Sequence, residues 1–392
     1  MDVHAPESCR RPRDDDAGTR KVITHEAGKC IPTIQCGRQH DRRPGVRGSQ
    51  QAVKIGTDAE GRVQENAPVS SWQKCGMLTN RTRVRSSYEV ARLSCISPGL
   101  PVTLERMLEI DPGFSLATTC GPAAWAGDRS PRQRWQAGRL TWVGHEGDAI
   151  TWRHVSQPES GLLRISGTAD PALDREWLRN VLGIETRLPP FTDPVIRNLA
   201  DRFPGLRPMS DGGLFAGLLT SIVGQSVSLA AAATTQRKLC LLFDPGFDLD
   251  GRLYHALPQV TDLAEASPAL IRTSGVTTRR AEAIVHAAKS QLAGELPDDE
   301  FARSRPEETV RQLLDLPGVG RWTAESAVLW GVGSPDAHPV NDVALLRAAR
   351  HAYERPDMTM RELDALAEHW RPGRSLAARL LWTNLFGPAP DH

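Results

Sequence analysis

Apolar residues recur at helical spacing through the second half of the chain, from the Pro189-Pro190 pair to the C-terminus. One helix is predicted to begin at Thr359, because Thr359 and Glu362 have the spacing of a capping box. Its apolar face would comprise Leu363, Leu366, Ala367 and Trp370. Gly and Pro residues interrupt the pattern between successive helices. The pattern therefore predicts a helical domain over residues 189–392.

Two further helix starts are predicted from hydroxyl side chains. Ser304, together with Glu307, is expected to open the helix that precedes a glycine-rich turn. Ser375 is expected to cap the last helix, residues 376–386, which Gly387-Pro388 terminates.

The pattern changes to short strands between residues 99 and 188. Thr, Trp, Val and Ile recur in the segments 114–118, 140–143, 149–152 and 163–166, and Gly or Asp lies between them. The two middle segments flank a polar turn at residues 144–148. They predict a β-hairpin over residues 140–152.

Residues 1–98 contain Arg, Asp, Gly, Pro, Gln and Ser with few periodic apolar positions, which is a composition typical of disorder. We therefore predict a disordered tail. Its basic stretches, such as residues 10–13 and 42–43, fit a solvated tail or a DNA-tethering arm. A third interpretation is upstream sequence translated from an early start codon, since Met77 and Met107 follow.

The segment 314–346 contains a turn that separates two stretches of helical apolar spacing. The turn is Leu316-Pro317-Gly318-Val319-Gly320, and it predicts two helices joined by a tight hairpin over residues 306–330. Gly318 and Gly320 permit positive φ, and they let the backbone N–H groups of the second helix approach an anion closely. A nucleic-acid phosphate is the natural anion for such a turn.

Composition limits the possible functions only weakly. A chain of 392 residues with 40% hydrophobic residues can form two domains and a tail. No apolar run reaches the length of a membrane span. The formal net charge of +1 gives no sign of a polyanion partner, so any DNA binding must come from a local surface.

Seven cysteines are scattered along the chain without a CxxC motif. This distribution favours a reducing compartment and argues against a zinc or iron–sulfur site, so we predict no bound metal. The N-terminus also lacks the apolar segment of a secretory signal. We expect a cytoplasmic protein, associated with the nucleoid if the source is bacterial.

The hairpin sequence LPGVGRWTA, followed by Asp342 in the segment HPVNDV, resembles the helix-hairpin-helix (HhH-GPD) DNA glycosylase superfamily. The tryptophan after the hairpin resembles the alkylbase branch, the DNA-3-methyladenine glycosylase II type. Two further blocks, residues 222–228 and 274–282, agree with it in order and spacing. The resemblance is strong from about residue 190 to the C-terminus, weak over residues 100–190 and absent before them.

This resemblance implies a mainly α fold. A small antiparallel α+β domain over residues 99–188, closed by a helix at residues 174–182, would precede the helical glycosylase domain. Some relatives carry a four-cysteine cluster after the catalytic helix, whereas no cysteine here follows Cys240. No cofactor is expected, apart from a monovalent cation that some such hairpins bind through carbonyl oxygens.

Asp342 is the candidate catalytic residue. Hydrolysis of an N-glycosidic bond passes through a sugar with oxocarbenium character, which a carboxylate can stabilise. The carboxylate can also orient or deprotonate the attacking water. An isolated aspartate at the start of a helix, here predicted at residues 343–351, is ordinarily only an N-cap. The hairpin at the family's spacing favours catalysis, and the neighbouring Asn341 is expected to bind the loop or the nucleotide backbone.

Trp322 occupies a position that resembles the nucleophilic lysine of bifunctional members of the superfamily. No lysine follows Lys289, so strand cleavage by that route is not expected. An indole can stack on a flipped, cationic N-methylated purine, with a cation–π contribution of ~1–2 kcal/mol. The alternative is that Trp322 packs in the core between the hairpin helices.

Ser326 and Gly373 complete the predicted base pocket with Trp322. Ser326 stands where the bacterial alkylbase enzyme typically has tyrosine, and Gly373 stands where it typically has a second tryptophan. The resemblance therefore implies a wider and less aromatic pocket. Ser326 and Gly373 therefore affect which damaged bases the pocket accepts. The type of reaction depends on Asp342 instead.

Gly318, Gly320 and Arg321 are expected to clamp a DNA phosphate. Backbone N–H groups bind phosphate without reading the base sequence, which suits an enzyme that scans DNA.

Extruding a base leaves a hole in the duplex that a side chain must fill. Ser226, after Gly224-Gln225, lies at the family's position for this role, and the larger Val227 is the alternative. Gln225 is expected either to contact the orphaned base or to close the turn after a helix at residues 214–223.

Together these features predict a monomeric, monofunctional DNA glycosylase that does not act at membranes. It would flip 3-methyladenine or 7-methylguanine out of damaged double-stranded DNA, hydrolyse the glycosidic bond and leave an abasic site for base excision repair. One alternative is a non-catalytic DNA-binding protein that retains the hairpin. Another is a glycosylase for deaminated or oxidised bases.

Overall fold

The computed structural model describes residues 21–24, 30–33, 93–94, 103–120 and 130–387. The chain separates into two compact units, one of residues 1–84 with 95–101 and one of residues 85–94 with 102–392. In the first unit, β1 (Lys21–Thr24) pairs with β2 (Cys30–Thr33) in antiparallel fashion. The tail predicted for residues 1–98 lies, apart from β1, β2 and β3 (Leu93–Ser94), outside the described residues.

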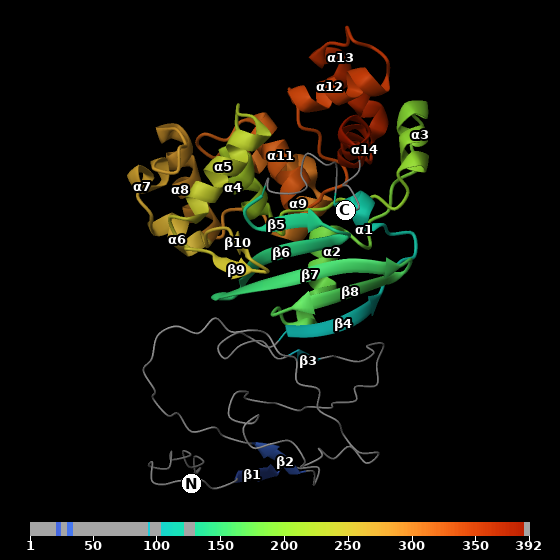
Figure 1. The fold of residues 1–392 in the computed structure, drawn as a ribbon. Coiled ribbons are helices and arrows are strands. Elements are labelled where there is room, and N and C mark those ends of the chain that lie inside the picture. The colour runs from blue at the N-terminus through green and yellow to red at the C-terminus, as the bar shows by residue number, and fades with distance from the viewer. Residues whose placement is uncertain (1–20, 25–29, 34–92, 95–102, 121–129, 388–392) are drawn as a thin grey trace, which may run out of the picture. The chain divides into compact units, whose positions relative to one another are not determined.

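The second unit contains a six-stranded antiparallel sheet (Figure 1). Its strands are β3, β4 (Thr103–Glu109), β5 (Gln133–Gln136), β6 (Arg139–Glu146), β7 (Ala149–Glu159) and β8 (Leu162–Gly167), in the order β3-β4-β8-β7-β6-β5. The β6–β7 pairing runs from Arg139 opposite Ser156 to Glu146 opposite Ala149. The hairpin predicted over residues 140–152 is therefore confirmed.

One face of the sheet packs against α2 (Asp174–Leu182). Val155 and Ile165 of the sheet and Leu178 and Leu182 of the helix share one buried apolar cluster. The helix has the residues predicted for it, and it ends at Gly183, which adopts a positive φ of 58°. The carboxylate of Asp174 accepts hydrogen bonds from Arg106 and, at 3.0 Å, from Arg153, and these bonds tie the helix to two strands.

The strand predicted at residues 114–118 is wrong. This segment contains a short helix, α1 (Leu116–Thr119), because the Ser115 hydroxyl accepts a hydrogen bond from the Thr118 N–H at 3.2 Å and caps a helical turn. The Leu116 N–H donates to Gln157 of β7 rather than to a strand ladder. Alternating apolar residues fit a capped turn as well as a strand, and the hydroxyl cap decides between them.

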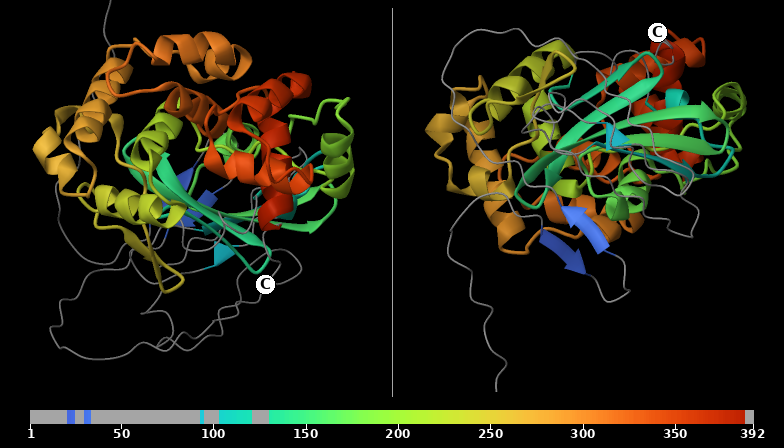
Figure 2. Two further views of the ribbon diagram at one scale, coloured as in Figure 1. Left: turned by 90° about the horizontal axis from the view of Figure 1, so that it is seen from above. Right: turned by 60° about the horizontal axis from the view of Figure 1, so that its bottom comes forward.

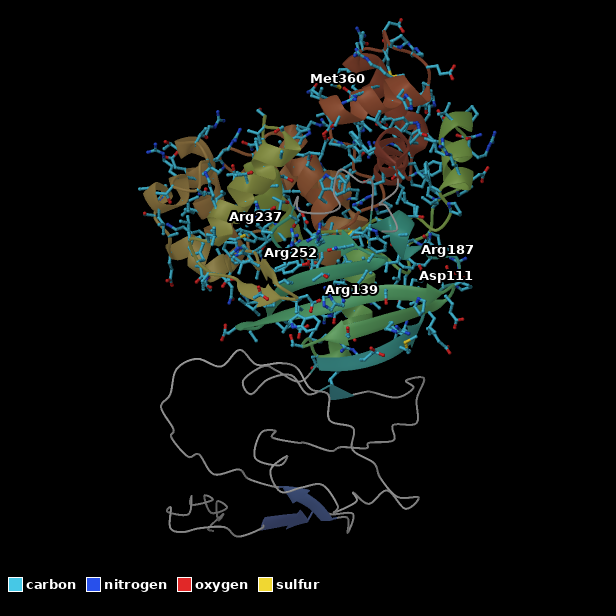
Figure 3. All side chains as sticks on the ribbon, in the orientation of Figure 1. Asp111, Arg139, Arg187, Arg237, Arg252 and Met360 are labelled. Atoms are coloured by element: carbon cyan, nitrogen blue, oxygen red, sulfur yellow. The ribbon has the colours of Figure 1, made fainter. Side chains whose placement is uncertain are left out.

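The rest of the second unit is mainly helical, which confirms the predicted fold class. The helices are α3 (Pro194–Arg202), α4 (Leu214–Gly224), α5 (Leu229–Cys240), α6 (Val260–Glu265), α7 (Pro268–Arg272), α8 (Thr278–Leu292), α9 (Asp299–Ser304), α10 (Pro306–Leu313), α11 (Arg321–Gly331), α12 (Val343–Ala352), α13 (Met360–Ala367) and α14 (Arg374–Phe386). Two 3₁₀ helices, η4 (Pro171–Leu173) and η5 (Glu368–Trp370), and a small hairpin of β9 (Phe247–Leu249) and β10 (Arg252–Tyr254) complete it. Arg139 is labelled in Figure 3. Its guanidinium lies 3.1 Å from the Asp250 carboxylate, and this ion pair links β6 to the turn of the hairpin.

The predicted helix starts agree with the structure at one position and differ from it at two. The capping box at Thr359 and Glu362 is confirmed. The starts predicted at Ser304 and Ser375 are wrong. Pro306 begins α10 without a side-chain cap, since its fixed φ suits the first turn of a helix. Ser375 lies within α14, and its hydroxyl accepts from the Ala337 N–H at 2.8 Å.

α4 and α11 cross with their backbones in direct contact. A Cβ atom on Gly217 would lie 2.3 Å from the Cα of Gly331 and 2.5 Å from the carbonyl oxygen of Ala327. Only glycine permits this separation, which fixes α11 beside α4. Within the described residues no single helix is long and apolar enough to cross a membrane. α4 and α5 reach that length and composition only as a pair bent by 119°.

The helices of this unit form two groups (Figures 1 and 2). One group contains α4 to α8, and the other contains α3 and α12 to α14, with α11 between them. Residues of α11 line a cleft.

Candidate active site

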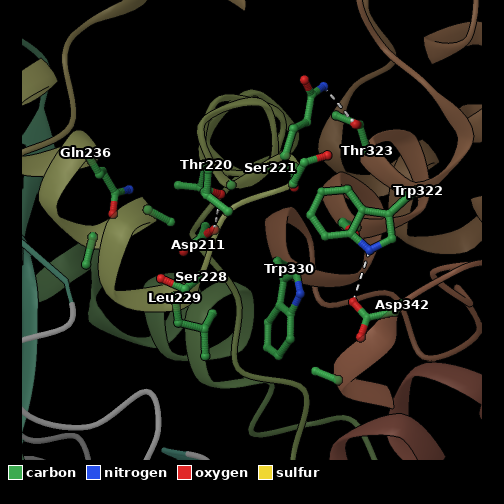
Figure 4. Close-up of a pocket in the computed structure, with 18 of the residues that line it drawn as sticks. Asp211, Thr220, Ser221, Ser228, Leu229, Gln236, Trp322, Thr323, Trp330 and Asp342 are labelled. Atoms are coloured by element: carbon green, nitrogen blue, oxygen red, sulfur yellow. Dashed lines mark hydrogen bonds between the residues drawn. The ribbon is translucent and has the colours of Figure 1, made fainter. Parts of the chain in front are cut away.

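A cleft of about 1360 Å³ brings together most of the residues predicted to form the site (Figure 4). Its lining includes Trp322, Ser326 and Asp342, together with Gln225, Ser226, Gly318 and Gly320. These residues come from the end of α4, the hairpin, α11 and the start of α12, which are far apart in the sequence.

Asp342 is both the N-cap of α12 and a wall of the cleft. One carboxylate oxygen accepts the Leu345 N–H at 2.7 Å, as expected for a cap. The other oxygen accepts the indole N–H of Trp322 at 3.0 Å (Figure 4). Both oxygens are thus oriented by N–H donors, and the side chain remains only half-buried. The same carboxylate therefore caps α12 and faces the cleft.

Trp322, Ser326 and Trp330 line the cleft from a single face of α11. Their spacing of four residues places them one above the other on consecutive turns. Trp330 was missed in the sequence, although the same helical periodicity indicates it. The Trp330 ring is fixed by the Arg379 guanidinium, 4.3 Å from the ring centroid, and by Trp382, which stacks at 5.4 Å.

Gly373 lies outside the cleft lining, which corrects its place in the predicted base pocket. It forms the N-cap of α14, where a Cβ atom would lie 2.5 Å from Cγ of Pro189 and 2.9 Å from the Phe191 ring. The space that a side chain would need is therefore already filled. The missing tryptophan leaves no open wall at this position.

The hairpin joins α10 and α11 through two glycines of different conformation. Gly318 has a φ of 81° and packs so closely that a Cβ would lie 2.8 Å from Cβ of Ala283. Gly320, which could also adopt a positive φ, has a φ of −96°. Apart from Gly320 itself and its two chain neighbours, no described residue has a heavy atom within 4 Å of a Cβ built there. The N-terminus of α11 is consequently open to an approaching anion.

Gln225 closes the turn after α4. Its side-chain amide donates to the Gly318 carbonyl at 3.1 Å and to the Thr323 hydroxyl at 2.9 Å. Its own carbonyl accepts a hydrogen bond from Arg280. Of the two alternatives for this residue, the geometry favours the structural one.

Apolar and polar side chains alternate at the mouth of the cleft beside Gln225. Ser226 is exposed with a positive φ of 53°, Val227 is 42% exposed, and Leu229 in the first turn of α5 is 45% exposed. All three line the cleft. The structure thus adds Leu229 to the two candidates for filling a gap in a duplex.

Arg321 and Glu325 connect the hairpin to the loop before Asp342. The exposed Arg321 donates from Nε to one Glu325 oxygen at 2.9 Å, and the Val340 N–H donates to the other oxygen at 2.8 Å. Burial raises the pKa of Glu325, whereas these two hydrogen bonds lower it. Glu325 was not singled out in the sequence, because its contact with Val340 exists only in the folded chain.

Further arginines border the cleft. Arg279 and Arg347 are exposed, and Arg280 is partly buried. Together with Arg321 they provide the local positive surface that a net charge of +1 does not reveal.

No group of three or more His, Cys, Asp or Glu side chains within the described ranges could hold a metal ion. Cys120 and Cys240 are buried free thiols. Burial raises the pKa of Cys240 to about 12.

No protein-family model matches the chain. The chain is 35% identical over 201 residues to the "Probable bifunctional transcriptional activator/DNA repair enzyme AlkA" of Mycobacterium tuberculosis, covering 50% of this chain and 38% of that protein. It is 30% identical over 194 residues to "DNA-3-methyladenine glycosylase 2" of Escherichia coli, covering 50% of this chain and 66% of that protein.

The fold is also similar to that of a solved 3-methyladenine DNA glycosylase from Archaeoglobus fulgidus. The TM-score is 0.60 at 19% identity, with 71% of this chain and 98% of that chain covered. This likeness concerns the fold alone. The chain belongs to the helix-hairpin-helix DNA glycosylase superfamily, in its DNA-3-methyladenine glycosylase II type.

Proposed function

We propose that this protein is a monofunctional DNA glycosylase that excises alkylated purines, such as 3-methyladenine and 7-methylguanine, from double-stranded DNA. The observation that carries the proposal is the Asp342 carboxylate, which two N–H donors orient at the wall of a cleft large enough for a flipped nucleotide. The product is an abasic site for base excision repair.

The chemistry follows from the position of Asp342. As the glycosidic bond breaks, positive charge develops on the sugar, and the fixed carboxylate stabilises it without having to reorganise. Water bonds to C1′ through its oxygen and gives up a proton to the Asp342 carboxylate, while the base leaves with the electron pair of the glycosidic bond. The Trp322 indole restrains the carboxylate through its N–H and presents an aromatic ring on which a cationic alkylpurine can stack.

The composition of the cleft supports hydrolysis by water rather than attack by an amine. None of the residues that line the described cleft is a lysine. The resemblance to the superfamily also places Trp322 where its bifunctional members have their lysine. Formation of a Schiff base needs a primary amine close to the sugar.

Duplex DNA is the proposed partner, bound by a monomer. The open N-terminus of α11 at Gly320 and the exposed side chains of Arg279, Arg321 and Arg347 offer donors for phosphate oxygens. Exposed Val227 and Leu229 lie at the cleft mouth, where a side chain can occupy the space of an extruded base.

Incubation of the protein with methylated duplex DNA should release free 3-methyladenine and 7-methylguanine, quantified by mass spectrometry. The DNA strand should stay intact until alkali cleaves the abasic sites, because no lysine lines the described cleft. Release of hypoxanthine or uracil from deaminated duplex DNA, with no release of base from methylated DNA, would instead indicate a glycosylase for deaminated bases. Binding of DNA without release of any base would indicate a non-catalytic protein.

Replacing Glu325 with alanine should lower kcat about tenfold while the affinity for DNA changes less than about threefold. The substitution removes the acceptor of the Val340 N–H and loosens the loop that positions Asp342, and misplacement of a catalytic group by about 1 Å can cost up to 100-fold. Single-turnover rates and DNA-binding titrations separate the two effects.

Glu325→Gln is the matched control for this loop. Its amide oxygen can still accept the Val340 N–H, so kcat should remain within about threefold of wild type. Equal losses in the two variants would show that the ion pair with Arg321, rather than the hold on the loop, is what matters.

A further inference from the structure

The cleft extends beyond the place where a single base would stack. Eight positions separate Trp322 from Trp330, which corresponds to about 12 Å along a helix at about 1.5 Å per residue. A planar ring stacked on Trp322 adds only ~3.5–4 Å perpendicular to the plane of the indole. Both tryptophans line the same cavity (Figure 4), so space beyond the base remains along α11.

Ser326 lies between the two tryptophans on the same helix face. Its side chain is small, and the residue is only 1% exposed. Its hydroxyl has no hydrogen-bond partner among the described residues. The small side chain also leaves the path from Trp322 to Trp330 open.

Trp330 forms a fixed aromatic surface at the far end of this path. Arg379 and Trp382, both from α14, hold its ring. Figure 4 shows the indole projecting into the pocket between Asp342 and the side chains of Asp211 and Thr220. An immobilised aromatic ring binds a second ring with little loss of side-chain entropy.

The polar wall opposite Trp330 already has partners within the protein. The two oxygens of the Asp211 carboxylate accept hydrogen bonds from the Thr220 hydroxyl at 2.8 Å and from Arg132 at 3.0 Å. This part of the cleft therefore does not require a polar substituent, and stacking on Trp330 is the main interaction that it offers.

We infer that the cleft accepts purines that carry an aromatic substituent on a ring nitrogen, an inference that rests on the proposed glycosylase function. The purine stacks against Trp322 beside Asp342, and its substituent passes over Ser326 to stack on Trp330. Ser326 and Trp330 are then residues that determine specificity and take no part in bond cleavage.

The test compares duplex DNA alkylated with benzyl bromide and duplex DNA methylated to the same extent, with released bases quantified by mass spectrometry. Wild type should release benzylated purines at a rate within about tenfold of the rate for methylated purines. Ser326→Tyr fills the path and should lower the benzyl-to-methyl rate ratio at least about tenfold. Trp330→Leu removes the distal ring and should lower the ratio by a similar factor, because the substituent loses the surface on which it stacks.

Trp177→Leu is the matched control. Trp177 is a partly buried tryptophan on α2 that contacts Trp142 outside the cleft, so its loss should leave the ratio unchanged. Melting curves identify any variant that fails to fold, and either Ser326→Tyr or Trp330→Leu alone suffices as a test.

The outcomes separate this inference from the proposed function. Release of methylated purines without benzylated ones overturns the inference and leaves the proposed function intact. An unchanged ratio in folded Ser326→Tyr or Trp330→Leu also overturns the inference. Absence of release from both substrates by a protein that binds DNA overturns the proposed function, and the inference with it.

Discussion

Substitution of Asp342 by asparagine should reduce the rate of base release from methylated duplex DNA by about 100-fold or more. Asparagine has almost the same shape and is an equally good N-cap, so the Leu345 N–H keeps its acceptor and α12 keeps its start. The amide carries no negative charge to stabilise the developing sugar cation. Its single oxygen also cannot serve the Trp322 indole and the Leu345 N–H with the original geometry.

The measurement is the single-turnover rate at matched protein and salt concentration, together with a DNA-binding titration. Binding should change less than about threefold. Asp298→Asn is the matched control, because Asp298 is an exposed N-cap that accepts the Phe301 N–H at 2.7 Å and lies outside the cleft lining. If folded Asp342→Asn keeps more than about a tenth of the wild-type rate, Asp342 does not carry the catalysis.

Substitution of Gly217 by alanine should destabilise the protein by about 3 kcal/mol, at the upper end of the range for overpacked cores. The added Cβ would lie 2.3 Å from Cα and 2.5 Å from N of Gly331, so backbone atoms rather than a flexible side chain must move. α4 and α11 would have to separate, and α11 carries Trp322. The midpoint of urea unfolding should fall, and the surviving folded protein should also release base more slowly.

Gly144→Ala in β6 provides the control for this prediction. A Cβ at Gly144 would meet only the Trp142 side chain, at 3.4 Å, and the position has no positive φ. Its free energy of unfolding should stay within about 1 kcal/mol of wild type. An unchanged unfolding midpoint for Gly217→Ala would show that the two helices can move apart at little cost.

Local signals in the sequence determined much of the fold. α2 has the residues predicted for it, and the capping box at Thr359 begins α13 as expected. These features depend on hydrogen bonds and apolar spacing within a few residues, which a sequence displays directly. The segment 114–118 shows the limit of such signals, because its alternating pattern fits a strand and the Ser115 cap makes a helical turn.

The core of the candidate site was also present in the sequence. Asp342 and Trp322 follow a glycine-rich hairpin at a fixed spacing, and the fold joins them through a 3.0 Å hydrogen bond. The remainder of α11 and one loop separate the two residues along the chain, so their contact is seen only in the folded protein.

Only the tertiary structure decided the shape and supports of the cleft. Phe191 and Pro189 fill the space at Gly373 and exclude it from the lining, although its sequence context placed it in the pocket. Glu325 holds the loop of Asp342, and Trp330 lines the far end of the cleft. Each of these depends on side chains packed from distant segments, which the close crossing of α4 and α11 at Gly217 brings within reach. Local sequence determines which residues can perform the chemistry, and long-range packing determines which of them face the same cavity.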